Sequence, residues 1–207
     1  SRGLGDVYKR QANAGDEAML TAIIESLRQV EKNVELTVLS GNPEDTAAKH
    51  QVCSVYRFNP LGIIRAMKDS ELIISGGGSL LQDVTSKRSL LYYLSIIGLG
   101  KFFGKKVMLF AQGIGPIRAK WARKLTSLVC NEADLITVRD SESAAELIEM
   151  GVKPEKITVT ADSVLSLNPV TKECGQYLLQ EAGVDLTKPV IGISVRPWSG
   201  DSQCFQV

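Results

Sequence analysis

The stretch Glu71-Leu-Ile-Ile-Ser-Gly-Gly-Gly-Ser-Leu-Leu-Gln-Asp83 decides the fold, because a short apolar run stops in three glycines and then turns polar. Three consecutive apolar residues are typical of a strand in a parallel sheet that is covered on both faces. The glycines have no Cβ, so their main chain can take positive φ and lie against a bound group with its N–H donors free. A plain tight turn is the alternative. The predicted ligand-binding residues of this loop are Gly76, Gly77, Gly78, Ser79, Gln82 and Asp83.

Two glycine motifs with known mechanics do not fit. A dinucleotide fingerprint would need a third glycine where Leu81 stands, and after Gly113 and Gly115 the same place is held by Arg118. In the segment 98–106 the spacing of a phosphate-binding P-loop fails by one residue, and a lysine occupies the Ser/Thr position. That segment is better interpreted as a helix end and the turn into the next strand.

Composition excludes several classes of protein. The 207 residues contain 44% hydrophobic side chains, enough for a proper core. With 24 Lys+Arg against 23 Asp+Glu there is no basic field, which argues against nucleic acid as a partner. Four cysteines without paired spacing and a single histidine, His50, which we expect to be solvent exposed, argue against a metal site. No apolar run is long enough to cross a bilayer, so we expect a cytoplasmic protein with reduced thiols.

Strands and helices alternate along the middle of the chain. This alternation predicts an α/β fold, a parallel sheet with right-handed crossovers and helices on both faces. The first helix should turn an apolar stripe of Met19, Ile23, Leu27 and Val30 to one side. Helices are predicted over 16–31, 60–68, 89–103, 119–133 and 141–150, strands over 34–39, 72–74, 106–111, 135–138 and 157–160, and a short helix and strand within 43–58.

The ends of the chain differ from its middle. Residues 1–11 have neither strand nor helix periodicity and are interpreted as a non-native leader, although a strand would be expected before the first helix. We predict an N-terminal Rossmann-like domain over 12–168 and a linker helix region over 169–189. Residues 190–207 are interpreted as the start of a truncated second domain, beginning with a strand.

Polar residues follow each predicted strand. Ligands of parallel α/β sheets bind beyond the carboxyl ends of the strands, so these residues outline a candidate site. Arg139 comes directly after a buried run and just before a helix start, where N–H groups and the helix dipole favour anions. A purely structural Arg139–Asp140 pair is an equal alternative, and Asp162 can equally cap a turn. Other predicted contacts at strand ends are Gln112, Gly113 and Arg196.

Five segments together resemble the polysaccharide pyruvyl transferase family, in its CsaB-like branch. They cover nearly the whole chain, and each is weak alone, but their order makes the signal specific. One departure is Ala12, where a glycine would be usual. The segments are Asn13-x-Gly-Asp-Glu-Ala, Ile74-Ser-Gly-Gly-Gly-Ser-Leu-Leu-Gln-Asp83, Gln112-Gly-Ile-Gly-Pro-Ile117, Thr137-Val-Arg-Asp-Ser141 and Ile193-Ser-Val-Arg-Pro-Trp198.

The resemblance implies the N-terminal half of a GT-B-like enzyme with two Rossmann-like domains. It implies transfer of a pyruvyl group from phosphoenolpyruvate to a sugar of a bacterial cell-wall or capsular polysaccharide, as a ketal, with release of phosphate and no further cofactor. Arg139 matches the family's anion-binding arginine. The expected acid is a histidine of the second domain, to which His50 does not correspond, so the catalytic residues stay unassigned and the fragment is expected to be inactive. Asp16, Glu17 and Asp83 are candidate contacts for sugar hydroxyls.

Two other functions stay open. A GT-B glycosyltransferase that uses a nucleotide sugar would fit the same fold, because fold alone does not fix function. A binding-only Rossmann-like module is the third reading. The expected partners are phosphoenolpyruvate and a saccharide acceptor, with a lipid-linked acceptor at the inner face of the membrane as one option.

Overall fold

The computed structural model of the chain describes residues 14–84 and 86–193. Internal contacts divide the chain after Leu167 into two units, each of which is described by itself. In order, the elements are α1 (Ala14–Val30), β1 (Thr37–Ser40), α2 (Pro43–His50), β2 (Cys53–Tyr56), α3 (Pro60–Asp69), β3 (Leu72–Gly76), α4 (Lys87–Phe102), β4 (Lys106–Gln112), α5 (Lys120–Glu132), β5 (Leu135–Val138), α6 (Ser141–Glu149), η2 (Pro154–Lys156), β6 (Ile157–Val159), η3 (Ser163–Ser166) and α7 (Lys172–Glu181).

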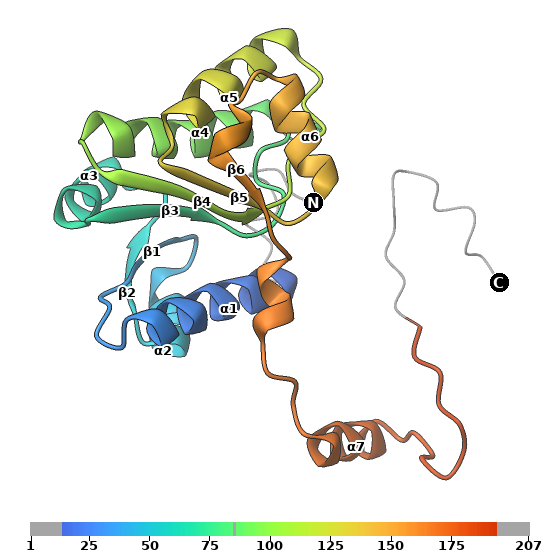
Figure 1. The fold of residues 1–207 in the computed structure, drawn as a ribbon. Coiled ribbons are helices and arrows are strands. Elements are labelled where there is room, and N and C mark those ends of the chain that lie inside the picture. Colours follow the sequence, from blue (N-terminus) through green and yellow to red (C-terminus); the bar gives the residue numbers. More distant parts are fainter. Residues whose placement is uncertain (1–13, 85, 194–207) are drawn as a thin grey trace. The chain divides into compact units, whose positions relative to one another are not determined.

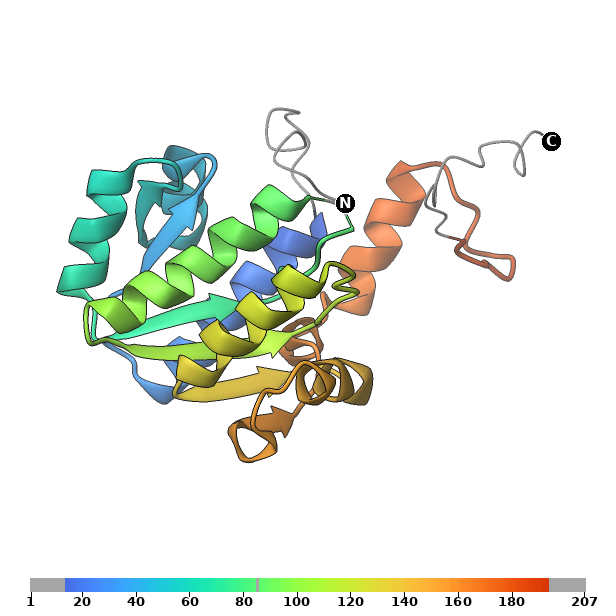
Figure 2. The same ribbon diagram turned by 90° about the horizontal axis from the view of Figure 1, so that it is seen from above.

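The strands of the first unit pair in parallel. β3, β4, β5 and β6 form one four-stranded sheet in that order, and β1 pairs with β2 in a separate two-stranded sheet. Figures 1 and 2 show α4 and α5 on one face of the larger sheet and α1 on the other. The predicted α/β fold with parallel strands and helices on both faces is therefore confirmed. The strand expected before α1 would lie in residues 1–13, outside the described residues.

Local sequence explains where helices begin. At α3, Pro60 occupies the first turn, and the Asn59 side chain accepts a hydrogen bond from the N–H of Gly62 (3.0 Å). At α6, the Asp140 carboxylate accepts from the N–H of Ser143 (2.7 Å). Both side chains satisfy N–H groups that have no partner within the helix, so the helix starts are fixed locally.

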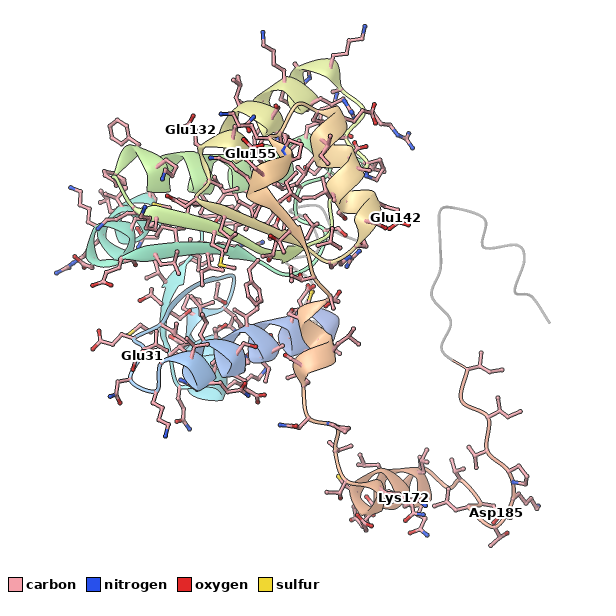
Figure 3. All side chains as sticks on the ribbon, in the orientation of Figure 1. Glu31, Glu132, Glu142, Glu155, Lys172 and Asp185 are labelled. Atoms are coloured by element: carbon pink, nitrogen blue, oxygen red, sulfur yellow. The ribbon has the colours of Figure 1, made fainter. Side chains whose placement is uncertain are left out.

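The core of the first unit lies against the four-stranded sheet. Gly100 of α4 lets the helix approach closely, because an added Cβ would lie 3.0 Å from Val107 and 3.2 Å from Ile73. Labelled charged side chains such as Glu31, Glu132 and Glu142 lie on the outside, as Figure 3 shows. The largest buried side chains are Leu81, Leu90, Leu94, Ile97, Leu109, Ile117, Ile136 and Leu147.

Two sequence-based expectations need correction. The strand predicted from Val34 begins only at Thr37, because Val34 donates its N–H to the carbonyl of Glu31 (3.2 Å) and so belongs to the turn after α1. Val30 was placed on the apolar stripe of this helix but is 88% exposed. It is the last residue of α1.

The second unit contains α7, which falls within the predicted linker region 169–189. The Thr171 hydroxyl caps its start by accepting from the N–H of Cys174 (3.3 Å). Gly183 follows its end with φ of 79°. Residues 190–193 form no strand, and the rest of the predicted strand, with Arg196, lies outside the described residues.

Asp134 ties the start of β4 to α4, and its removal should weaken the fold in a pH-dependent way. Its carboxylate accepts from Lys101 (2.7 Å), Lys106 (3.2 Å) and the N–H of Val107 (2.8 Å). The hydrogen bond from Lys101, followed by that from Val107, holds the pKa of Asp134 well below its usual range. A lowered folded-state pKa gives stability above the unfolded-state pKa of about 3.9, which is lost as the pH falls through the folded-state value.

We therefore expect Asp134→Asn to lower the free energy of unfolding by about 1 kcal/mol at pH 7, a value reduced because the residue is partly exposed. The difference from the parent protein should shrink below about pH 4 in thermal melts. Asp45→Asn is the matched control, because Asp45 forms an exposed ion pair with Lys49 (2.7 Å) and should matter little. An Asp134→Asn effect of equal size at pH 3 and pH 7 would contradict this account.

Candidate functional site

Polar groups gather where the strands of the larger sheet end. Because β3, β4, β5 and β6 are parallel, their carboxyl ends share one edge. The glycine loop (residues 76–79) follows β3, Gly113 follows β4, Arg139 follows β5 and Asp162 lies shortly after β6. Side chains far apart in the sequence thus meet at this edge.

Arg139 is the centre of that meeting point. Its Nη2 donates to the Ser79 hydroxyl (3.1 Å), its Nε lies 3.3 Å from the Asp140 carboxylate, and its Nη1 lies 3.3 Å from the Asp162 carboxylate. The side chain is one-third exposed. These four residues, with Gly113, are called the Arg139 cluster below. The structure therefore brings together three residues that the sequence analysis assigned to a site: Ser79, Gly113 and Arg139.

Gly113 makes room for the guanidinium of Arg139. A Cβ added to Gly113 would lie 2.7 Å from both Cζ and Nε of Arg139. The N–H of Gly113 meanwhile donates to the carbonyl of Gly78 (2.9 Å), which ties the end of β4 to the glycine loop. A residue with a side chain at position 113 would therefore displace Arg139.

The two carboxylates of the Arg139 cluster hold the guanidinium in place, but they and Ser79 do not occupy all of its N–H donors. Asp140 also caps α6, and hydrogen bonds from Ser143, followed by that from Arg139, lower the pKa of Asp140. Asp162 caps η3 through the N–H of Val164 (3.1 Å). A guanidinium has five N–H donors. Three are engaged, so one N–H on each Nη of Arg139 has no partner among the described residues.

The glycine loop packs against α1. Gly77 and Gly78 have φ of 75° and 64°, and an added Cβ on either would lie 3.3 Å from Met19. At Gly76 the added atom would lie 2.9 Å from Ile23. The N–H of Gly77 donates to the carbonyl of Phe110 (3.1 Å). Close approach to the helix and positive φ thus explain the three glycines, and a direct contact with a ligand stays a prediction.

The Asp83 side chain binds the backbone just before α5. Its carboxylate accepts hydrogen bonds from the N–H groups of Arg118 (3.0 Å) and Ala119 (2.9 Å), just before α5 begins. Burial raises the pKa of Asp83, but the backbone hydrogen bonds from Ala119 and Arg118 outweigh it, and the pKa is lowered. Asp83 therefore holds the segment that leads into α5, and its predicted contact with a sugar is untested.

Gln112 lies inside the fold. Its Nε2 donates to the carbonyl and to the hydroxyl of Ser75 (2.8 Å each), and the residue is fully buried. Its Oε1 is buried without a hydrogen-bond partner among the described residues.

The preceding Ala111 has φ of 47° at a register shift between β4 and β5, and its N–H donates to the Thr137 hydroxyl (2.7 Å). This irregularity ends regular pairing where the candidate site begins.

The two carboxylates at the start of α1 lie in different surroundings. Asp16 is exposed, whereas Glu17 lies 3.3 Å from the ring nitrogen Nε2 of His50. The side chain of His50 is only 10% exposed, so the expectation of an exposed histidine is wrong. Its burial follows from the packing of α1 on α2, where Arg28 donates to the carbonyls of His50 (3.1 Å) and Gln51 (2.9 Å).

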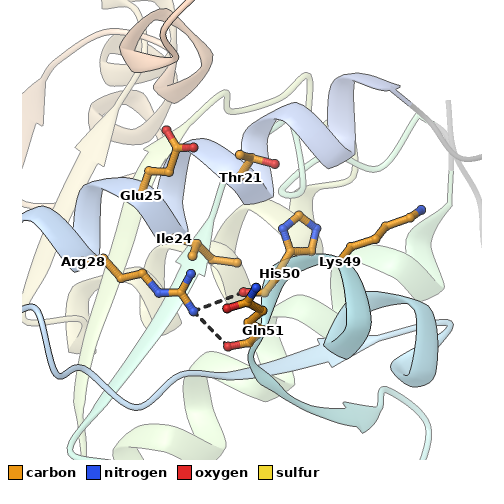
Figure 4. Close-up of a pocket in the computed structure, with 7 residues that line it drawn as sticks. All are labelled: Thr21, Ile24, Glu25, Arg28, Lys49, His50 and Gln51. Atoms are coloured by element: carbon orange, nitrogen blue, oxygen red, sulfur yellow. Dashed lines mark hydrogen bonds between the residues drawn. The ribbon is translucent and has the colours of Figure 1, made fainter.

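A polar pocket lies beside this contact. It is lined from α1 and from the end of α2, as Figure 4 shows, and has a volume of about 200 Å³. Arg28, Glu25 and Lys49 line it, so charges of both signs face the space. No group of three metal-ligating side chains occurs within residues 14–84 and 86–193.

Two site residues depended on tertiary structure to be found. The sequence predicted Asp162 either as a capping or turn residue or as a ligand contact. Its carboxylate caps η3 and also contacts Arg139, and a direct ligand contact stays a prediction. Arg57 was not singled out, although its guanidinium carbon lies 5.0 Å from the centre of the Phe58 ring and its carbonyl accepts from the Tyr92 hydroxyl. The adjacent tyrosines 92 and 93 in a predicted helix were the sequence signal for this contact. Gln82 is half-buried beside Leu81, which bridges to Ile114.

The fold and the Arg139 cluster define a Rossmann-like α/β domain with charged and polar groups at the edge where such domains bind their ligands. The chain belongs to the polysaccharide pyruvyl transferase family, whose sequence model matches residues 13–195. None of the curated proteins compared with the chain matches it.

Two solved structures resemble the chain in fold. They are Anabaena Alr3699/HepE in complex with UDP and glucose, at 12% identity, and the same protein in complex with UDP-glucose, at 11% identity. Each has a TM-score of 0.52, and the match covers 84% of this chain. It covers 48% and 47% of those chains, so the chain spans about half of their length. At this identity the likeness supports the fold alone. Separately, no helix of the described residues is long and apolar enough to cross a membrane.

Proposed function

We propose that this chain forms part of an enzyme that transfers a pyruvyl group from phosphoenolpyruvate to a saccharide as a ketal. Membership of the family supports a transferase acting on a polysaccharide. The observation that carries the choice of donor is Arg139, with one uncommitted N–H on each Nη at the strand ends. Phosphoenolpyruvate carries a phosphate and a carboxylate, and a guanidinium can bind either through two hydrogen bonds.

The reaction balances without a cofactor. The methylene carbon of phosphoenolpyruvate takes a proton and becomes a methyl group, two sugar hydroxyl oxygens bond to the adjacent carbon, and the bond from that carbon to the phosphate oxygen breaks. The two hydroxyl groups lose two protons in total. One is balanced by the proton that the methylene carbon gains, and the other leaves with the phosphate. The enzyme therefore needs an acid, a base and fixed donors for two anionic groups.

Residues of the Arg139 cluster can supply the fixed donors. Asp140 and Asp162 hold the guanidinium in one orientation, so little side-chain freedom is lost when an anion binds. Ser79 can donate its own hydroxyl proton to the same anion while it accepts from Arg139. The family resemblance implies that the acid is a histidine of a second domain, and the base is unassigned.

Phosphate release provides the test. The full-length protein should release phosphate from phosphoenolpyruvate only when a saccharide acceptor is present, and the product should gain the mass of a pyruvate ketal. We place this reaction in the cytoplasm, with a lipid-linked acceptor presented at the inner membrane face. Phosphate release that is independent of any saccharide would contradict the proposal.

A glycosyltransferase is the second candidate. The observation in its favour is that the two similar structures hold UDP and glucose or UDP-glucose. Such an enzyme would release UDP from UDP-glucose in the presence of a saccharide and ignore phosphoenolpyruvate. Running both donors against the same acceptors separates the two candidates.

Gly113→Ala should impair donor use while leaving the fold intact. The three atoms nearest to the new methyl group would all belong to the end of the Arg139 side chain, which is flexible and can move away. We expect kcat/KM for phosphoenolpyruvate to fall about tenfold with little change in melting temperature, as for one lost charge-assisted hydrogen bond. Gly98→Ala in α4 is the matched control, because its Cβ would meet nothing within 4 Å. If the two variants have the same kcat/KM for phosphoenolpyruvate, Arg139 is not part of the donor site.

A further inference from the structure

Four aromatic side chains form a continuous run beside the end of β2. Tyr56 and Phe58 have ring centroids 5.8 Å apart, Phe58 and Tyr92 also 5.8 Å, and Tyr92 and Tyr93 5.3 Å, all in edge-to-face arrangement. Tyr56 is 41% exposed and Phe58 38%. These four residues are called the aromatic run below. The exposed rings of Tyr56 and Phe58 present apolar surface to solvent, which costs free energy unless a partner covers it.

Arg57 lies within the aromatic run. Its guanidinium carbon lies 5.0 Å from the centre of the Phe58 ring, and its backbone carbonyl accepts the Tyr92 hydroxyl (3.0 Å). The Nε of Arg57 is buried and has no hydrogen-bond partner among the described residues. A buried N–H of a charged group is rarely left unpaired in a folded protein. The Arg57 guanidinium therefore still has hydrogen-bonding capacity for a partner at this place.

The aromatic run and the Arg139 cluster belong to neighbouring segments of the chain. Tyr92 and Tyr93 lie in the first two turns of α4, which begins at Lys87, shortly after the glycine loop. Ser79 of that loop contacts Arg139.

We infer that Arg57 and the aromatic run bind sugar rings of the acceptor saccharide. A pyranose ring has apolar C–H faces and a polar edge of hydroxyl groups, and sites for such ligands combine apolar surfaces with a few placed polar groups. Phe58 and Tyr56 supply the apolar surface, and the Arg57 guanidinium beside the Phe58 ring supplies a donor for a hydroxyl oxygen. This inference rests on the proposed transfer to a saccharide and names the place where that saccharide lies.

Binding can be measured without catalysis. Saturation-transfer NMR on the full-length protein, with glucose, galactose, mannose and their 2-acetamido analogues as probes, should show transfer to ring C–H protons of at least one sugar. Phe58→Ala should abolish this transfer. If no probe receives saturation from the parent protein, the inference is wrong, whether or not the enzyme uses phosphoenolpyruvate.

Kinetics with a saccharide that supports phosphate release give the second readout. Phe58→Ala should raise the KM for that acceptor about tenfold, as expected for the loss of one aromatic contact, and change the KM for phosphoenolpyruvate less than about twofold. Arg57→Lys keeps the charge but has no Nε and should give an intermediate increase.

The far end of α4 offers a matched control. Phe102 is 80% exposed and pairs with Phe103 at 5.4 Å, and Lys68 lies over the Phe103 ring at 5.7 Å. Phe102→Ala therefore removes an exposed ring from a similar aromatic and cationic group, and it should leave both KM values unchanged. Equal effects of Phe58→Ala and Phe102→Ala would overturn the inference. So would a folded Phe58→Ala protein that keeps its acceptor KM but binds vesicles of phosphatidylglycerol more weakly, since the rings would then face lipid.

Discussion

Replacing Arg139 with alanine is expected to reduce kcat/KM for phosphoenolpyruvate by about one to two orders of magnitude. Loss of a charge-assisted contact to a bound anion costs roughly 1.5–3 kcal/mol. The change also leaves Asp140 and Asp162 without their shared cation, so two carboxylates would face the incoming anion. The KM for the acceptor should change far less. Steady-state kinetics with each substrate varied in turn measure both effects.

Two further variants make this result specific. Arg139→Lys should recover only part of the activity, because an ammonium group cannot make the planar two-point contact. Arg123→Ala is the matched control. Arg123 also contacts two carboxylates, those of Glu146 (2.7 Å) and Glu149 (3.1 Å), and is 24% exposed. It should cost stability without a selective loss of donor use. Unchanged donor kinetics in a folded Arg139→Ala protein would remove Arg139 from the site.

Gly77→Ala should have the largest effect on stability. Gly77 is buried, its φ of 75° is unfavourable for alanine, and the new methyl group would lie 3.3 Å from Met19. We expect a loss of about 1–3 kcal/mol in the free energy of unfolding. If the loop also contacts a ligand, turnover per folded molecule should fall as well, and we predict this for at least one of Gly76, Gly77 and Gly78.

Gly104→Ala is the control that distinguishes the effect of backbone strain from the effect of a close contact or a bound ligand. Gly104 has φ of 70°, close to that of Gly77, but an added Cβ there would meet nothing within 4 Å. Its variant should lose stability from strain alone and keep full turnover per folded molecule. Melting temperature and turnover are measured on both variants. A Gly77→Ala protein whose turnover falls only in proportion to its folded fraction would make the glycine loop a plain turn.

Local sequence patterns were enough to predict the strands and helices that lie around the candidate site. The apolar run before Gly76 is β3, and Arg139 lies after a buried strand as expected, because strand ends and helix starts depend on neighbouring residues. The same local reasoning put Asp83 among polar loop residues. It could not show that Asp83 binds the N–H groups of Arg118 and Ala119, 35 and 36 residues away, in the segment before α5.

Tertiary contacts account for the features that the sequence did not reveal. His50 reads as a polar residue of a polar helix, and only the packing of α1 on α2 buries it next to Glu17, 33 residues away. Arg57 and Tyr92 meet across 35 residues. Such partnerships depend on which helix crosses which strand, and periodicity within one element carries no information about them.

The left-handed residue in β4 limits which amino acids the chain can carry there. Ala111 combines φ of 47° with an exposed fraction of only 4%. Branched and long side chains are disfavoured by the backbone conformation and by the space, since left-handed φ suits few residues with a Cβ. Asparagine tolerates the conformation, but it would bury an amide with no partner provided for it. Relatives that keep this backbone conformation should therefore have only alanine or glycine at position 111. Alanine at most other buried positions can be replaced by a wider set of residues.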